Sequence, residues 1–323
     1  MRDSRLNEAE HPLQHSFRKA LVFNSLLMAS AVGAAHLALR SLPSVPTLPP
    51  SVADVTFKPV DLFPVGGPLH LAGAWEMTVA DRRFGGISAL ALDGGRFLAV
   101  SDRGSVVSFD RPSIRMPKAW IADLRQGPGP WGRKWARDAE SIAADPEGRG
   151  WWVGYEQNHS LWLYDSAFGH ALASIDLHRP DWWDNRGAEG LMAENGALLV
   201  MAENGREAMR VESGRIERLS LAAGADVAEA ATAPDGSSWL LLRNKGWGGI
   251  SQSIAPIVKV GQGHRTESKL PLPKHAFDNY EGMAIEERPG GELRFWLISD
   301  DGHRLMARTL LVALDYRPKA RND

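Results

Sequence analysis

The chain has 323 residues, of which 44% are hydrophobic, and a formal net charge of −2 at pH 7. This is enough apolar sequence for one large β domain or two ordinary ones, and the lack of a basic excess argues against nucleic acid as a partner. No cysteine occurs, which excludes disulfides, thiolate metal sites and a cysteine nucleophile.

The N-terminal segment has the pattern of a membrane-targeting helix. Arg18 and Lys19 precede the largely apolar residues 20–39, and Arg40 follows them. A positive start before such a run fits a cleaved signal peptide, and the run is also long enough to stay as a membrane anchor. Residues 1–40 are therefore expected to act as a signal peptide or as an inner-membrane anchor. Either way, the rest of the chain is expected in the periplasm or another extracytoplasmic compartment.

A proline-rich stretch, residues 41–54, follows and predicts an extended linker. The globular domain is expected to cover residues 55–317, with a short tail at 318–323. We expect this domain to be a monomer.

One pattern occurs five times after the linker. A short apolar stretch is followed by a turn of glycine, proline, aspartate or asparagine, and then by a second strand-like stretch. Each copy predicts a β-hairpin. We number the hairpins one to five in chain order, and they cover residues 85–102, 138–156, 187–203, 226–243 and 279–300.

The spacing of the hairpins predicts a β-propeller. Aligned on Ser88, Glu140, Glu189, Glu229 and Glu281, the copies are 52, 49, 40 and 52 residues apart, which is about the length of a four-stranded blade. We therefore predict an all-β fold, a propeller of five or six four-stranded blades, preceded by the N-terminal helix. Third strands are expected at 106–109, 161–164, 257–260 and 309–314, and residues 69–79 are expected to close the ring. A β-sandwich is the main alternative, but it has no reason to repeat a glutamate at one place in successive hairpins.

Acidic residues recur at one end of the hairpins. The first strands carry Glu140, Glu189, Glu229 and Glu281 near their starts, and the second strands run out into Asp102, Glu156, Glu203 and Asp300, whereas Arg243 breaks the second set. In a hairpin these two places lie at the same end, so a propeller would gather the acids in one ring. Clustered carboxylates need a compensating charge, and an all-oxygen cluster suits calcium. A purely structural role, in which these acids accept backbone hydrogen bonds, is the alternative.

Basic residues near the same end could hold a phosphate. They include Arg103, Arg137, Arg186, Lys245 and Arg304. A metal ion with such residues would polarise a phosphoryl group while a carboxylate orients water. The sequence has no nucleophile elbow, phosphate-binding loop or zinc-protease helix.

Several short motifs, in order, resemble a known family, the phytase-like β-propellers described as having the esterase-like activity of phytase. The resemblance spans about residues 84–316 and implies an exported bacterial propeller with an acidic, calcium-binding channel mouth and phosphoester or ester hydrolysis. The motifs are Gly85-Gly-Ile-Ser88, Ser101-Asp-Arg-Gly104, Asp138-Ala-Glu140, Asn185-Arg-Gly-Ala-Glu-Gly-Leu191, Asn279-Tyr-Glu-Gly-Met283, Ser299-Asp-Asp301 and Arg308-Thr-Leu-Leu311.

The leading functional hypothesis is a calcium-dependent hydrolase of small phosphoesters. Glu189 and Glu281 are the expected catalytic residues, and Arg103, Arg186 and Arg304 are expected to bind the substrate. The alternatives are a propeller that binds a ligand or partner at the cell envelope without catalysis, and a metal-dependent carboxylester or lactone hydrolase. The expected calcium ligands are Asp102, Glu140, Glu189, Glu229, Glu281 and Asp300.

Overall fold

The computed structural model describes residues 47–62, 67–129, 137–177, 187–246, 249–272, 279–302 and 307–317. Every regular element in these residues is a β-strand, and none of them forms a helix long and apolar enough to cross a membrane. The predicted targeting helix at 20–39 and the tail at 318–323 lie outside the described residues.

The strands form five antiparallel meanders, which we call blades one to five after the hairpin that each contains. The first strand of each hairpin is innermost and the following strands lie successively further out. Blade one contains β3 (Ile87–Asp93), β4 (Arg96–Ser101), β5 (Ser105–Phe109) and β6 (Lys118–Asp123). Blade two contains β7 (Ala139–Ala144), β8 (Gly150–Tyr155), β9 (Ser160–Asp165) and β10 (Ala171–Asp176).

The remaining blades follow the same order. Blade three contains β11 (Ala188–Glu194), β12 (Ala197–Ala202), β13 (Glu207–Glu212) and β14 (Arg215–Ala222). Blade four contains β15 (Asp226–Thr232), β16 (Ser238–Gly246), β17 (Gly249–Val260), β18 (Gly263–Thr266) and the short β19 (Leu270–Pro271), which pairs with β17. Blade five contains β20 (Asn279–Arg288), β21 (Glu292–Asp300), β22 (Leu310–Tyr316) and β2 (Leu69–Val79). The predicted third strands are therefore confirmed as β5, β9, part of β17 and β22.

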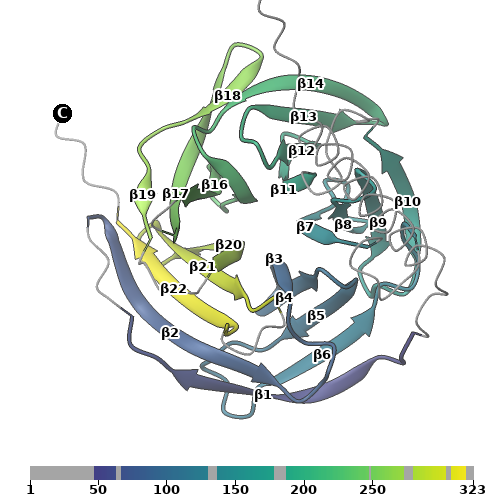
Figure 1. Ribbon diagram of the computed structural model, residues 1–323, viewed down its shortest axis with the longest axis vertical. Helices are drawn as coiled ribbons and strands as arrows, with labels where there is room; N and C mark the ends of the chain where they lie inside the picture. Colours follow the sequence, from purple (N-terminus) through teal and green to yellow (C-terminus); the bar gives the residue numbers. More distant parts are fainter. Residues whose placement is uncertain are drawn as a thin grey trace, which may run out of the picture. The chain divides into compact units, whose positions relative to one another are not determined.

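The five innermost strands close into a ring. Strand β3 contacts β7, β7 contacts β11, β11 contacts β15, β15 contacts β20, and β20 returns to β3. Figure 1 shows the blades arranged around this centre. The described residues thus have the architecture of a β-propeller with five blades.

Two strands from the start of the domain close the ring. Strand β2 pairs with β22, as predicted for residues 69–79, and so supplies the outer strand of blade five. Strand β1 (Ser51–Pro59) pairs with β6 through Ser51–Asp54 and with β2 through Val55–Pro59, so it joins blade one to blade five. Residues 51–54, expected to belong to the linker, are therefore part of the domain, because their backbone extends the sheet of blade one.

Apolar side chains pack between neighbouring blades and hold the ring together. Trp239 and Phe295 meet edge to face at 4.8 Å between blades four and five, and Phe97 and Trp296 meet at 4.9 Å between blades one and five. Trp151 and Trp152 are buried in the clusters on the two sides of blade two. Such aromatic pairs stabilise a core beyond the area that they bury.

Candidate functional site

Each innermost strand carries a β-bulge near its start, and four of the five bulges fall on the residues used to align the hairpins. The pairing register skips Ser88 in β3, Glu140 in β7, Glu189 in β11 and Glu281 in β20. A bulge frees a residue from the ladder and re-aims its side chain, which is why bulges occur beside functional sites. The repeat inferred from the sequence is therefore also a structural repeat.

The fourth hairpin departs from this repeat by one residue. Its register skips Ala228, between Val227 and Glu229, so Glu229 is not the equivalent of the other glutamates, and the alignment on Glu229 was wrong. Because strand side chains alternate between faces, a shift of one residue changes a side chain's surroundings completely.

Glu229 lies on β15, one of the five innermost strands. Its side chain accepts a hydrogen bond from the Ala230 amide at 2.9 Å, and the residue is only 1% exposed. Burial raises the pKa of Glu229 well above its ordinary value, against the opposing effect of the backbone amides of Ala230, Leu191 and Leu90. These contacts correspond to the structural role considered in the sequence analysis, as an acceptor for backbone groups of several blades.

Blade two brings three carboxylates together. Oxygens of Asp138, Glu140 and Glu156 lie within 4.8 Å of one another, and the three residues are 2%, 7% and 6% exposed. The hairpin pairing creates this arrangement, since the Glu156 amide donates to the Asp138 carbonyl at 2.8 Å. We call these residues the carboxylate triad. Its oxygen-only donor set, shielded from water, fits a hard cation such as calcium.

Blades three, four and five meet in an ion-pair cluster. Arg243 donates through Nη1 to Glu281 Oε1 at 2.7 Å and through Nη2 to Glu203 Oε1 at 3.2 Å. Lys245 Nζ also donates to Glu203 Oε1, at 3.0 Å. The Arg243 side chain is 7% exposed. We call Glu203, Arg243, Lys245 and Glu281 the arginine cluster. The residue that broke the acidic series in the sequence is thus a buried cation within the ring.

Glu189 interacts electrostatically with members of both the carboxylate triad and the arginine cluster. Burial raises the pKa of Glu189 well above its ordinary value; Glu156, Glu203 and Glu281 add to the shift, and Arg243 opposes it. For Arg243, burial works to lower the pKa, but Glu189, Glu281 and Glu203 together raise it above the ordinary range. The neighbouring carboxylates therefore disfavour the ionised form of Glu189, and a nearby cation would favour it.

Three further predicted residues, Asp102, Arg103 and Asp300, lie in the described part of the chain and have different surroundings. Asp102 is buried, and its amide donates to the Gly86 carbonyl. Asp300 accepts from the Gly302 amide at 2.6 Å. Arg103 is exposed to solvent, whereas Arg186 and Arg304 lie outside the described residues. Of the six expected calcium ligands, Glu140 is the one that belongs to the carboxylate triad.

Arg137, considered above as a phosphate-binding residue, has a structural role instead. It is 5% exposed, and its Nε donates to the carbonyls of Pro128 at 2.9 Å and Gly129 at 3.2 Å. Its two Nη atoms donate to the carbonyls of Leu124, Arg125 and Gly127. Burial lowers the pKa of Arg137. The guanidinium thus holds the backbone of residues 124–129 against Arg137, the residue that precedes Asp138 of the carboxylate triad.

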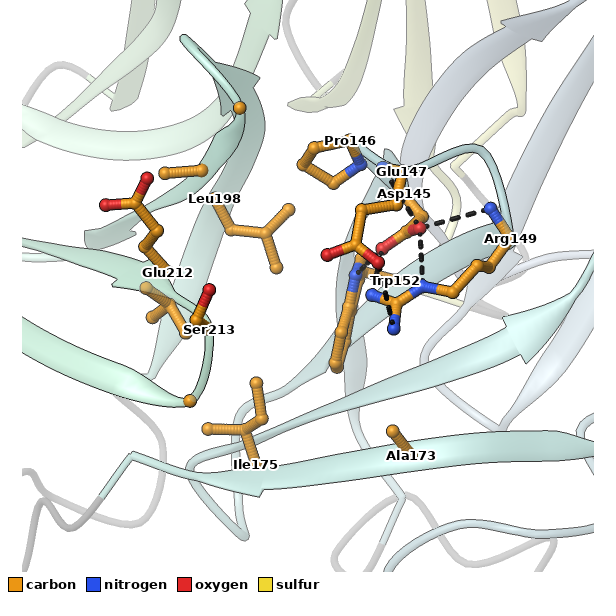
Figure 2. A pocket seen from close by; sticks show the side chains of 14 residues that line it. Asp145, Pro146, Glu147, Arg149, Trp152, Ala173, Ile175, Leu198, Glu212 and Ser213 are labelled. Carbon is orange, nitrogen blue, oxygen red and sulfur yellow. Dashed lines mark hydrogen bonds and ion pairs between the residues drawn. The ribbon is translucent and has the colours of Figure 1, made fainter.

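Two cavities lie away from the acidic end. One, of about 410 Å³, is lined by all five innermost strands and is largely apolar. Figure 2 shows the other, of about 270 Å³, between blades two and three. Asp145 lies beside it and accepts from Trp152 Nε1 at 2.7 Å and from Arg149 Nε and Nη2 at 2.9 Å. These bonds close the β7–β8 turn, so Asp145 supports the fold at the end opposite the carboxylate triad.

We expect Asp145→Asn to lower the free energy of unfolding by about 1–2 kcal/mol at pH 7. Hydrogen bonds from Arg149 lower the pKa of Asp145 from 3.8 to about 2. The stabilisation is therefore complete above pH 4 and is lost as the pH falls toward 2. Urea unfolding at pH 7 and pH 3 measures it. Asp235→Asn, in the exposed turn of hairpin four, is the matched control, and an equal loss in both variants would contradict the prediction.

Comparison with known proteins identifies one family. A family model described as "Phytase-like: Esterase-like activity of phytase" matches residues 82–303. No curated protein matches the chain. Myxococcus xanthus glutaminyl cyclase is similar in structure at 14% identity, with 79% of this chain and 100% of that chain covered and a TM-score of 0.49.

Two further solved structures are similar at low identity. Kuenenia stuttgartiensis hydrazine synthase shows 14% identity and a TM-score of 0.41 over 73% of this chain and 64% of that chain, so the match spans less than two thirds of the larger protein. A protein of unknown function from Bacteroides caccae shows 10% identity and a TM-score of 0.41 over 83% of this chain and 100% of that one. Likeness at this level carries no functional argument, so the fold assignment rests on the strand order.

Proposed function

The chain belongs to the phytase-like family with the esterase-like activity of phytase, and on that premise we propose that it is an extracytoplasmic, calcium-dependent hydrolase of small phosphoesters. The carboxylate triad carries the proposal. Three buried carboxylates whose oxygens lie within 4.8 Å of one another form an oxygen-only donor set of the kind that binds calcium. Of the predicted catalytic and phosphate-binding residues, Glu189, Glu281 and Arg103 lie in the described residues, at the same end of their hairpins.

In this proposal Asp138, Glu140 and Glu156 hold calcium, which would polarise the phosphoryl group and stabilise the charge on its oxygens. Arg103, exposed beside Asp102, attracts the phosphate. Glu189 and Glu281 orient the attacking water. In the reaction a bond forms from the water oxygen to phosphorus, the ester P–O bond breaks, and the departing oxygen takes up a proton.

The compartment is part of the proposal. Residues 20–39 have the pattern of a signal or anchor, and export would place the domain where calcium is more available than in the cytoplasm. Proteinase accessibility in intact spheroplasts tests this location, since a cytoplasmic domain would be protected.

A second candidate function is ligand binding without catalysis. The observation that favours it is the arginine cluster, in which Glu203 and Glu281 already receive hydrogen bonds from Arg243 and Lys245. A carboxylester or lactone hydrolase using the same cation is the third, because the family description includes esterase-like activity.

Turnover of p-nitrophenyl phosphate and p-nitrophenyl butyrate by the same preparation separates these functions. The proposal expects calcium-dependent release of p-nitrophenol from the phosphate ester, its loss on chelation, and its return when calcium is added back. Turnover of the butyrate alone would support the ester hydrolase. Absence of turnover with both substrates, at saturating calcium, would favour the binding protein.

For Arg103 we expect the substitution Arg103→Ala to raise KM for p-nitrophenyl phosphate about tenfold while changing kcat less than threefold. The exposed guanidinium adds attraction that is equal in the ground state and the transition state. Steady-state kinetics measures both constants. Arg82→Ala is the control, because Arg82 is also on a loop but is not adjacent to an acid of the ring. A fall in kcat with unchanged KM would contradict the assigned role.

A further inference from the structure

Blade five contains an oxygen set equivalent to the carboxylate triad of blade two. In blade two, Glu140 is skipped by the pairing register, and Glu156 follows the strand residue Tyr155 opposite Asp138. In blade five, Glu281 is skipped in the same way, and Asp300 pairs with Asn279. Asn279, Glu281 and Asp300 therefore occupy the positions of Asp138, Glu140 and Glu156. All three residues offer oxygen atoms of the kind that binds calcium.

A guanidinium already contacts the glutamate of this second set. Arg243 Nη1 donates to Glu281 Oε1 at 2.7 Å, and Asn279 Nδ2 donates to the same oxygen at 2.5 Å. Asn279 Oδ1 is buried and has no hydrogen-bond partner among the described residues. An amide oxygen left unpaired beside a carboxylate is arranged as a cation ligand would be.

The position of Arg243 in its hairpin explains why it contacts Glu281. It lies on β16 opposite Asp226, the first residue of β15, where the other hairpins have Asp102, Glu156, Glu203 and Asp300. Three of these residues interact with the next blade: Glu156 contributes to the raised pKa of Glu189 in blade three, Glu203 accepts from Arg243 of blade four, and Arg243 contacts Glu281 of blade five. Blades two and three therefore bring together like charges, Glu156 and Glu189, whereas blades four and five bring together opposite charges, Arg243 and Glu281.

We propose that Arg243 takes the place of a second divalent cation. The wild-type ring then binds one cation, at the carboxylate triad, and the equivalent oxygens of blade five bind another only when the guanidinium is removed. Arg243 is thus a positioning residue that fixes the number of cations and holds Glu281 in place. This inference rests on the calcium part of the proposed function.

Calcium-binding stoichiometry of the metal-stripped full chain tests the proposal, by isothermal titration with calcium chloride. We expect one calcium per wild-type chain, one for Arg243→Lys, which keeps the charge, and two for Arg243→Gln. Adding Glu140→Gln to Arg243→Gln should return the number to one, which assigns the new site to blade five. A folded Arg243→Gln variant, checked by circular dichroism, that binds one calcium would overturn the proposal.

A second variant keeps the test decisive if Arg243→Gln does not fold. Glu281→Gln in the wild-type background should still bind one calcium, with Kd changed less than threefold, because Glu281 is paired with Arg243 rather than with the bound ion. Loss of calcium binding in this variant would overturn the inference. Wild-type protein that binds no calcium would instead refute the calcium part of the proposed function, and a single site gained in Arg243→Gln would then still support the role of Arg243.

Discussion

Replacing Glu189 or Glu281 with glutamine is expected to lower kcat for p-nitrophenyl phosphate by about 100-fold or more, with the fold intact. Each glutamate lies near the start of its strand, at a β-bulge that changes the direction of the side chain. Glutamine keeps the size of the side chain but removes the charge that orients the attacking water, and such groups contribute about 100-fold to 10,000-fold in rate.

The control for this prediction lies on the same strand as Glu281. Glu287 is exposed near the far end of β20, so Glu287→Gln should leave kcat unchanged. Thermal unfolding of each variant separates loss of function from loss of structure. Equal, small reductions in all three variants would contradict a catalytic role for Glu189 and Glu281.

Replacing Arg137 with methionine is expected to lower the free energy of unfolding by about 2–4 kcal/mol. The side chain is buried, and it donates to five backbone carbonyls of residues 124–129. Methionine fills a similar volume but leaves these carbonyls without their donor. Because Arg137 precedes Asp138, the variant should also bind calcium more weakly.

Arg137→Lys is the informative companion, because lysine keeps the charge but lacks the planar fork of donors. We expect it to lose about half as much stability as Arg137→Met. Urea unfolding curves measure both variants. A loss below 1 kcal/mol for Arg137→Met would show that residues 124–129 hold their conformation without the guanidinium.

The sequence was sufficient to predict the repeat and most of its geometry. Turn residues and short apolar stretches located all five hairpins, and the aligned residues Ser88, Glu140, Glu189 and Glu281 coincide with the bulges. The bounds of strand β2 were predicted to the residue, because residues 69–79 lie before the first hairpin and were left to close the ring. Periodic patterns of this kind are local properties of the chain, so sequence alone conveys them.

The fourth hairpin was aligned wrongly because the glutamate of its first strand does not mark the position of the bulge. Residues 226–232 contain three alanines and one glutamate, so Glu229 was the natural choice for alignment. The backbone instead bulges at Ala228. The position of a bulge depends on pairing with the adjacent strand and on packing against neighbouring blades. The residues of one strand do not determine these contacts.

The grouping of charges could not be predicted, because it depends on contacts between blades. The pairing of Arg243 with Glu281 joins residues 38 positions apart, and the carboxylate triad selects Asp138 rather than Asp102 or Asp300. One signal was available: Arg243 was the single exception in the series of terminal acids. A weaker signal for the carboxylate triad was Asp138, an acid two residues before the aligned Glu140.

We propose that the acidic end of the ring binds calcium and uses it for hydrolysis. The most direct test is thermal unfolding of the metal-stripped chain during titration with calcium, with p-nitrophenyl phosphate turnover measured in the same samples. We predict that Tm and turnover rise together and saturate at the same calcium concentration, since ligand binding to the folded state stabilises it. If neither Tm nor turnover changes with calcium, the acidic end of the ring neither binds calcium nor uses it for hydrolysis.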